Sequence, residues 1–178
     1  MKKETLLKKV SKNGYMLQLG SEELKNDKEV VLAAIKQNGN ALKYTSEELK
    51  NNKEIVLEAV KQNAVSLYYA SDELQNNKEI VLEAVKKNGL AFAFASENLR
   101  NDKEFVLEAV KQNGNSLQYA SEELRADKDI LYISKNFLIS NKIDFLTEYE
   151  LLKSYERADG LNDKLVEKNN SIKIKVKI

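Results

Sequence analysis

The sequence contains neither cysteine nor histidine, and these two absences narrow the chemistry open to it. Without cysteine there are no disulfide bonds and no thiolate nucleophile, and nothing points to an oxidising compartment. Without either residue the chain also lacks an imidazole base and the usual zinc ligands. The few glycines are isolated, so no glycine-rich loop is present to cradle a phosphate. We therefore expect a protein that is not an enzyme and that holds no cofactor or metal ion.

The sequence also lacks a large excess of either charge sign, and it has no long hydrophobic run. The 178 residues include 29 basic and 28 acidic side chains, which leaves a net charge of +1. A protein that binds nucleic acid usually presents a strongly positive field, so this balance argues against such a partner. Lysines interrupt the apolar residues near the N-terminus, and no apolar stretch approaches the length of a signal peptide or membrane span. We expect no membrane association, and either a cytoplasmic location or export without a conventional signal peptide.

What the sequence does have is an internal repeat of 25 residues. The motif Ser-x-x-Leu recurs in register at Ser21, Ser46, Ser71, Ser96 and Ser121. A period of this length with more than one amphipathic segment per copy is typical of a solenoid, whose units are stable only when they stack. With 42% hydrophobic and 32% charged residues, the chain can bury a continuous core. We predict an all-α fold, an α-solenoid of about five helical repeats.

Each repeat contains a predicted helix, such as residues 27–39 with the sequence DKEVVLAAIKQNG. Asp27 stands where an N-cap side chain accepts from free backbone N–H groups, and Gly39 stands where a left-handed residue ends a helix. The helical spacing of apolar residues continues over 40–51, which predicts a short second helix. Ser46 either interrupts this helix as a new N-cap, leaving a helix followed by a tight helical turn, or lies within it. We favour the interruption.

The repeat pattern extends back to Lys3 and decays near residue 130. In the first copy Lys8 and Lys9 replace two alanines of the next copy, as expected where one helix face meets solvent instead of another repeat. The sequence thus predicts two regions, a helical repeat array over 1–129 and a C-terminal cap or tail over 130–178.

The C-terminal region is irregular and contains two segments with recognisable patterns. Apolar residues at helical spacing predict a helix over 142–159. Residues 172–178 alternate isoleucine or valine with lysine, a pattern typical of a strand. A single strand is unstable, so it would pair with another irregular segment such as 130–133, or with a second chain to form a homo-oligomer. A helical conformation is the third alternative for these residues.

Four landmarks recur in order within the copies: Ser-x-x-Leu, a Lys-Glu pair, an Ala-Val or Ala-Ile pair, and a final Asn-Gly that is once Asn-Ala. This unit resembles the repeat of the domain-of-unknown-function family numbered 4116, over roughly residues 1–130. The resemblance implies a helical repeat array and brings no activity or catalytic residues with it. The unit length is also similar to that of leucine-rich-variant repeats, which pair an α-helix with a shorter, tighter helix in a superhelix. That similarity concerns shape alone.

The lysines form two predicted rows along the array, and both have carboxylates nearby. The first row is Lys28, Lys53, Lys78, Lys103 and Lys128, each beside an acidic residue. The second row is Lys36, Lys61, Lys86 and Lys111, and three of these follow a glutamate by three residues, a spacing that allows ion pairs. Because both rows are then locally neutralised, we do not expect them to track phosphates.

The copies differ most at two positions of the predicted second helix, three residues apart and therefore on one helical face. We expect constant positions to serve the architecture and variable positions to contact a partner. This stripe is apolar in the middle repeats and polar on either side, as binding patches commonly are. The alternatives are that these positions vary by neutral drift, or that they fill a second core face where larger residues close local gaps. The predicted partner-binding residues are Tyr15, Gln18, Asn40, Lys43, Val65, Tyr68, Leu90, Ala93, Asn115 and Gln118.

We therefore predict a non-enzymatic protein-binding module that contacts another protein through this stripe. Such a module acts as an adaptor, or as an inhibitor that covers its partner's working surface, and the sequence does not choose between the two. A nucleic-acid-binding helical repeat protein is the alternative, which steep salt dependence would reveal. An enzyme would need a single cleft with a group of perturbed pKa, whereas the carboxylate pairs here, such as Glu22 and Glu23, are copied along the array.

Overall fold

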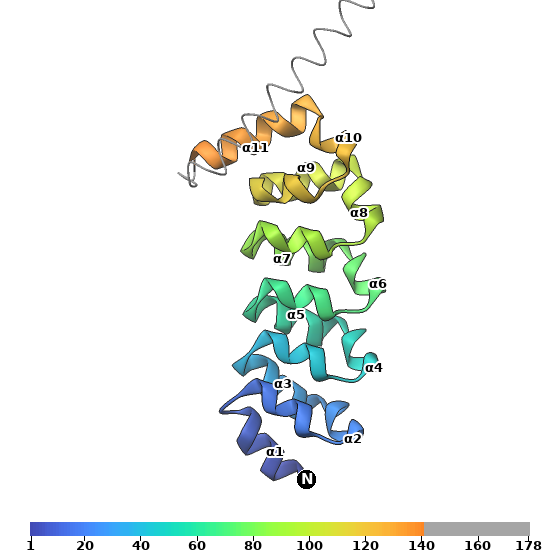
Figure 1. Cartoon of the computed structure of the whole chain (residues 1–178), viewed down its shortest axis with the longest axis vertical. Coiled ribbons are helices and arrows are strands. Elements are labelled where there is room, and N and C mark those ends of the chain that lie inside the picture. Colours follow the sequence, from blue (N-terminus) through green and yellow to red (C-terminus); the bar gives the residue numbers. More distant parts are fainter. Residues whose placement is uncertain (141–178) are drawn as a thin grey trace, which may run out of the picture.

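The structure is a computed structural model that describes residues 1–140. These residues form an elongated stack of helical repeats (Figure 1). Every regular element within this range is a helix, which confirms the all-α repeat fold. The predicted helix at 142–159 and the predicted strand at 172–178 lie outside the described residues.

The first element of each repeat is an α-helix, and these helices are stacked along the array (Figure 1). They are α1 (Lys3–Val10), α3 (Lys28–Gln37), α5 (Lys53–Gln62), α7 (Lys78–Lys87), α9 (Lys103–Gln112) and α11 (Lys128–Ser140). The predicted N-cap is confirmed at Asp27, whose side chain accepts from the backbone N–H groups of Glu29 and Val30. In α3 the buried residues are Val30, Val31, Ala34 and Ile35, so one face of the helix forms core.

The predicted second helix is a 3-10 helix, and the interruption at the serine is confirmed. Thr45 is extended (φ −77°, ψ 164°), and the Ser46 Oγ accepts from the backbone N–H of Leu49 to start a short α-helix. The 3-10 helices are η1 (Gly14–Leu19), η2 (Gly39–Tyr44), η3 (Ala64–Tyr69), η4 (Gly89–Phe94) and η5 (Gly114–Tyr119). The short helices are α2 (Glu22–Lys25), α4 (Glu47–Lys50), α6 (Asp72–Gln75), α8 (Glu97–Asn101) and α10 (Glu122–Arg125), which lie along one edge of the array (Figure 1).

The prediction that Gly39 ends a helix in the left-handed conformation is wrong. The residue that follows α3 is Asn38, in extended backbone (φ −156°, ψ 114°), and Gly39 begins η2 with no positive φ. Space explains the glycine, because a Cβ there would lie 2.4 Å from the carbonyl oxygen of Ala59 in the next repeat. Gly89 and Gly114 likewise begin 3-10 helices. The glycines therefore let neighbouring repeats approach each other.

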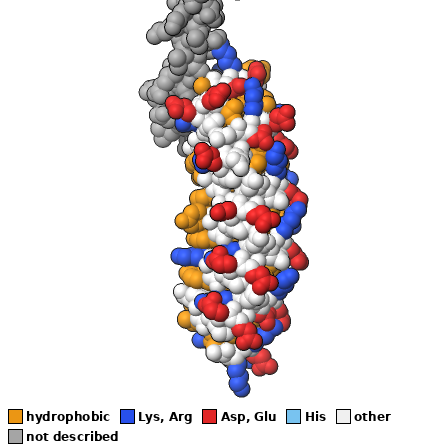
Figure 2. All heavy atoms as spheres, turned by 90° about the vertical axis from the view of Figure 1, so that its right-hand side faces the viewer, with side chains coloured by type: hydrophobic (Ala, Val, Ile, Leu, Met, Phe, Trp, Pro, Cys, Tyr) orange, Lys and Arg blue, Asp and Glu red, His pale blue; other side chains and the backbone are white. Residues whose placement is uncertain are grey.

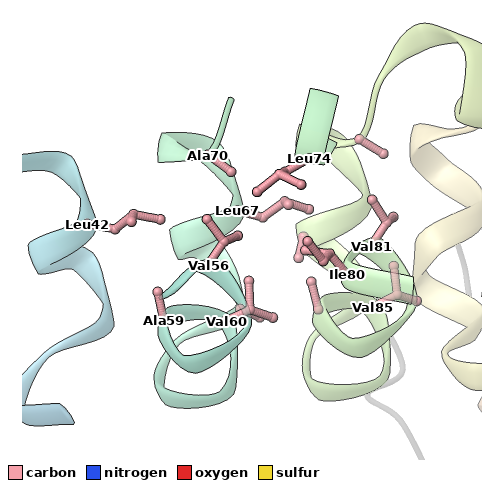
Figure 3. Packing of buried hydrophobic residues seen from close by; sticks show 14 of the residues in the cluster. Leu42, Val56, Ala59, Val60, Leu67, Ala70, Leu74, Ile80, Val81 and Val85 are labelled. Atoms are coloured by element: carbon pink, nitrogen blue, oxygen red, sulfur yellow. The ribbon is translucent and has the colours of Figure 1, made fainter. Parts of the chain in front are cut away.

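Buried side chains from neighbouring repeats share one core (Figure 3). Leu42 of η2, Val56 of α5 and Leu67 of η3 lie in the same cluster as Leu74 of α6 and Ile80 of α7. Each repeat contributes only a few apolar side chains, so the core is complete only where repeats stack. This arrangement explains why short α-helices and a six-residue 3-10 helix, which are marginal alone, are stable here.

Hydrogen bonds at the edge of the short helices also join the repeats. The backbone N–H of Ser71 donates to the carbonyl of Lys50 at 3.0 Å, and its hydroxyl donates to Asn51 Oδ1 at 2.5 Å. The same pair of bonds forms at Ser46 and Ser96. At these three serines each repeat is thus held in register with the preceding one through both backbone and side chain, and at Ser121 the backbone bond to Arg100 recurs.

The first helix differs from the inner helices on one face. Thr5 and Lys9 of α1 are exposed, whereas the equivalent Val30 and Ala34 of α3 are buried, because no described element covers that face of α1. Lys8 is exposed as well, in agreement with the expectation that these lysines meet solvent.

At the other end of the described range, α11 packs on α9 and η5. Residues 130–133, considered above as a partner for a strand, lie within this helix, so that expectation is wrong. The predicted boundary between 129 and 130 also falls inside α11, where Ile130 and Leu131 are buried.

Candidate functional site

The ten predicted partner-binding residues all lie on the 3-10 helices, at the second and fifth positions of each. Residues three apart in a 3-10 helix are eclipsed, so the two positions of each repeat share a face. The apolar members are unevenly exposed. Tyr68 is 59% exposed and Leu90 is 45% exposed, whereas Val65 and Ala93 are half-buried. The exposed part of the apolar stripe is therefore centred on Tyr68 and Leu90.

Several polar members of the stripe are engaged in the fold itself. The Asn40 Oδ1 accepts from Asn63 Nδ2 and from the Ser66 hydroxyl, both at 3.2 Å, which links η2 to the next repeat. The Gln118 side chain donates to the carbonyl of Asn115 within η5. Asn40 and Gln118 thus have structural roles, which favour the packing alternative at these two positions.

Aromatic side chains around Tyr68 form a cluster that the sequence analysis missed. The centre of the Tyr68 ring lies 5.3 Å from the ring centre of Phe94 and 5.1 Å from that of Tyr69, and both contacts have edge-to-face geometry. Tyr69 and Phe94 are half-buried against the core. We call Tyr68, Tyr69, Leu90 and Phe94 the aromatic cluster. It spans η3 and η4 and joins two repeats.

The missed residues, Tyr69 and Phe94, occupy a position that is large and apolar in every copy, and this was the signal that could have found them. The sixth residue of each 3-10 helix is Leu19, Tyr44, Tyr69, Phe94 or Tyr119. A rule that assigns constant positions to architecture discards this column, although its side chains are large and lie beside the variable ones. A smaller aromatic contact forms at the N-terminal end, where the rings of Tyr15 and Tyr44 are 6.1 Å apart.

Three lysines of the first row form ion pairs, and in each case the carboxylate belongs to the following repeat and not to the lysine's own. Lys78 Nζ lies 2.7 Å from a carboxylate oxygen of Asp102, and Lys103 Nζ lies 2.6 Å from one of Asp127. Lys53 pairs with Glu79 in the same way. The hydrogen bond from Lys78 and then that from the backbone N–H of Phe105 lower the pKa of Asp102. These pairs connect repeats and need no functional explanation.

The second lysine row is not neutralised as predicted. Within residues 1–140, none of Lys36, Lys61, Lys86 and Lys111 takes part in an ion pair. The side chain of Glu58, expected to pair with Lys61, instead accepts a hydrogen bond from Gln62 at 3.0 Å. All four lysines are exposed, so they retain their charge for another partner.

The edge of the short helices is mixed in charge. Figure 2 looks onto this edge, where red and blue side chains lie along its whole length, while orange hydrophobic side chains gather at the left margin of the view. Among residues 1–140, no group of three or more Asp and Glu side chains is placed to hold a metal ion. No helix in the same range is both long and apolar enough to span a membrane.

Comparison with known proteins identifies a family and nothing more specific. No curated protein and no solved structure matches the chain. The family described as Domain of unknown function (DUF4116) matches five times, over residues 2–50, 28–75, 52–100, 77–125 and 102–134. Successive matches overlap and advance by about one repeat, as expected for an array. The chain therefore belongs to the DUF4116 family of helical repeat proteins.

Proposed function

We propose that this protein is a non-enzymatic binding module that contacts another protein through the aromatic cluster on η3 and η4. The observation that carries the proposal is the exposure of Tyr68 and Leu90, together with the packing of the Tyr68 ring on the half-buried rings of Tyr69 and Phe94. A large apolar side chain in water has an unfavourable hydration free energy, which a partner surface removes.

The chemistry of the partner follows from the charges of the stripe. Lys43 is its one charged member, and it lies on η2 rather than within the aromatic cluster. Its Nζ is 5.7 Å from the Tyr44 ring centre, where it can contribute a cation–π contact. We expect an apolar segment of the partner to cover the aromatic cluster, with few charges at the centre of the interface.

The experiment is a pull-down with the full chain from nuclease-treated extracts of the source organism and its natural associates. The test variant carries Tyr68→Ser and Leu90→Glu, both at exposed positions, which spares half-buried Val65. Loss of two anchors of this size weakens binding by about 2 kcal/mol or more, or about 30-fold. A control variant with Asn98→Glu and Tyr132→Ser introduces the same two side chains at other exposed positions, and we expect it to bind like the wild type.

Two outcomes would refute the proposal. A partner that is retained equally by the test variant would show that the aromatic cluster is not the contact surface. If instead binding disappears on nuclease treatment and depends on Lys36, Lys61, Lys86 and Lys111, the ligand is a nucleic acid held by the second lysine row. Circular dichroism of each variant checks that the array is folded.

A further inference from the structure

The outward faces of α3, α5, α7 and α9 carry a second regular pattern, separate from the aromatic cluster. In each helix an exposed glutamate is followed three residues later by a half-buried leucine, and four residues after that by an exposed lysine. These spacings place the three side chains on one helix face. The triplets are Glu29, Leu32 and Lys36; Glu54, Leu57 and Lys61; Glu79, Leu82 and Lys86; Glu104, Leu107 and Lys111. Stacking of the helices makes three parallel rows, which are acidic, apolar and basic.

The structure brings residues of these rows together on one surface. An open hollow between α3 and α5 is lined by Leu32, Lys36, Glu54, Leu57, Glu58 and Lys61. Both leucines and both lysines of two neighbouring repeats therefore face the same space. Glu58 accepts a hydrogen bond from Gln62 of its own helix, and neither lysine forms an ion pair within residues 1–140.

The helix dipole explains part of this pattern. Acidic residues in the first turn and basic residues in the last turn stabilise a helix in isolation. The leucine between them packs against the core with part of its side chain, but it keeps the rest of its surface in water in every one of these helices. A continuous apolar row flanked by opposite charges is the arrangement expected of an interface.

We propose that this face binds a second copy of the chain, in a dimer whose two-fold axis runs parallel to the long axis of the array. Rotation about that axis lays each helix antiparallel to its own copy. The leucine rows then meet, and the acidic row of each chain faces the basic row of the other. A two-fold axis across the array would instead place acidic against acidic and basic against basic, so the charges select the parallel dimer.

The spacing within each helix fits this arrangement. At 1.5 Å per residue, the glutamate lies about 4.5 Å from its leucine along the helix axis, and the lysine lies about 6 Å away on the other side. In an antiparallel pair centred on the leucine, the glutamate of one chain and the lysine of the other thus differ in height by about 1.5 Å. Glu29 and Glu79 already pair with Lys3 and Lys53 of their own chain, whereas Glu54 and Glu104 form no ion pair within residues 1–140. Helices α5 and α9 therefore provide four such contacts between two chains.

The size of the face predicts a weak dimer. Each helix is about 15 Å long, and packed helices lie about 9 Å apart, so four helices present roughly 500 Å² per chain. A total of about 1,000 Å² is at the lower limit for a specific interface. We therefore expect reversible association that depends on protein concentration.

The first test uses the absence of cysteine, which makes any introduced cysteine unique. In the proposed dimer Leu57 lies near its own copy, so a Leu57→Cys full-length chain should form a disulfide-linked dimer under mild oxidation. A Tyr68→Cys chain is the control, because Tyr68 lies on η3, outside the rows, and it should remain uncross-linked. Failure of Leu57→Cys to cross-link, or equal cross-linking of both variants, would overturn the proposal.

The second test exchanges charges and does not alter the leucines. One variant carries Lys61→Glu and Lys111→Glu, and the other carries Glu54→Lys and Glu104→Lys. Sedimentation of the full chain should show self-association for the wild type, a dissociation constant at least 10-fold higher for each variant alone, and recovered association when the variants are mixed. A monomeric wild type, or variants that self-associate as the wild type does, would contradict the proposal. Apart from the Tyr68→Cys control, no variant in these tests alters the aromatic cluster, so the two proposals can fail separately.

Discussion

Replacing Gly39 with alanine tests whether space, rather than backbone conformation, requires glycine at the start of the 3-10 helix. Because Gly39 has no positive φ, alanine meets no backbone penalty there. If conformation alone mattered, Gly39→Ala would stabilise the protein by about 0.4–1 kcal/mol, because it reduces the freedom of the unfolded chain. The structure predicts the opposite sign.

The predicted penalty comes from three atoms. The new Cβ would lie 2.4 Å from the carbonyl oxygen of Ala59, 2.8 Å from the Ser66 Oγ and 3.0 Å from the backbone nitrogen of Asn63. Ordinary contacts require at least 3.4 Å, so the next repeat must move by about 1 Å. Overpacking by one methyl group costs about 1–3 kcal/mol, and after the unfolded-state gain we expect a net loss of about 1–2 kcal/mol.

The assay is urea unfolding of the full chain, followed by far-ultraviolet circular dichroism. The slope of the unfolding free energy against urea concentration is compared between variants, so that a change in midpoint can be read as a change in stability. Ser66→Ala removes one of the three contacts, so a double-mutant cycle should show that Gly39→Ala costs less in the Ser66→Ala background. The backbone contact with Ala59 remains, so the rescue is partial. A Gly39→Ala protein as stable as the wild type, or more stable, would refute the steric explanation.

Three further predictions concern the contacts between repeats. Ser71→Ala removes a helix N-cap and a hydrogen bond to the preceding repeat, and it should lower the free energy of urea unfolding by about 1 kcal/mol. Ser121→Ala is the control, because the side chain of this serine forms no cap bond, and it should cost less than half as much. Ser116→Ala removes a buried hydroxyl without a partner among the described residues and should be neutral or stabilising, whereas Ser66→Ala loses a bond to Asn40 and should cost about 1 kcal/mol. The pKa of Asp102 is lowered in the folded protein, so its ion pair stabilises the fold above the pKa of the unfolded chain, and this contribution is lost as the pH falls through the folded pKa. In a series of thermal-unfolding measurements at decreasing pH, Asp102→Asn should therefore lose less stability at acid pH than the wild type does.

The fold could be predicted from the sequence because its landmarks are local. A 25-residue period, an N-cap aspartate and a helical spacing of apolar residues identify the α-helices directly. Gly39 could not be interpreted in the same way, because its reason is a carbonyl oxygen of Ala59, which belongs to the next repeat. A single repeat carries no information about the distance to its neighbour.

The candidate site could be predicted only in part, because contacts between repeats decide the role of several of its residues. Variation between copies pointed to Tyr68 and Leu90, which are indeed exposed. It also pointed to Asn40, whose side chain bonds to the next repeat, and it passed over Phe94, which contacts Tyr68 across repeats. Both differences arise from contacts between repeats, which a comparison of aligned copies does not reveal.

The central claim is that the aromatic cluster contacts another protein, and site-specific photo-crosslinking tests it most directly. A benzophenone amino acid replaces Tyr68 in the full chain, and a control chain carries it at Lys28, an exposed position on α3 outside the cluster. After nuclease treatment and irradiation in extracts of the source organism and its associates, we expect a discrete protein adduct from position 68 and none from position 28. The same adducts from both positions, or none from position 68, would contradict the claim.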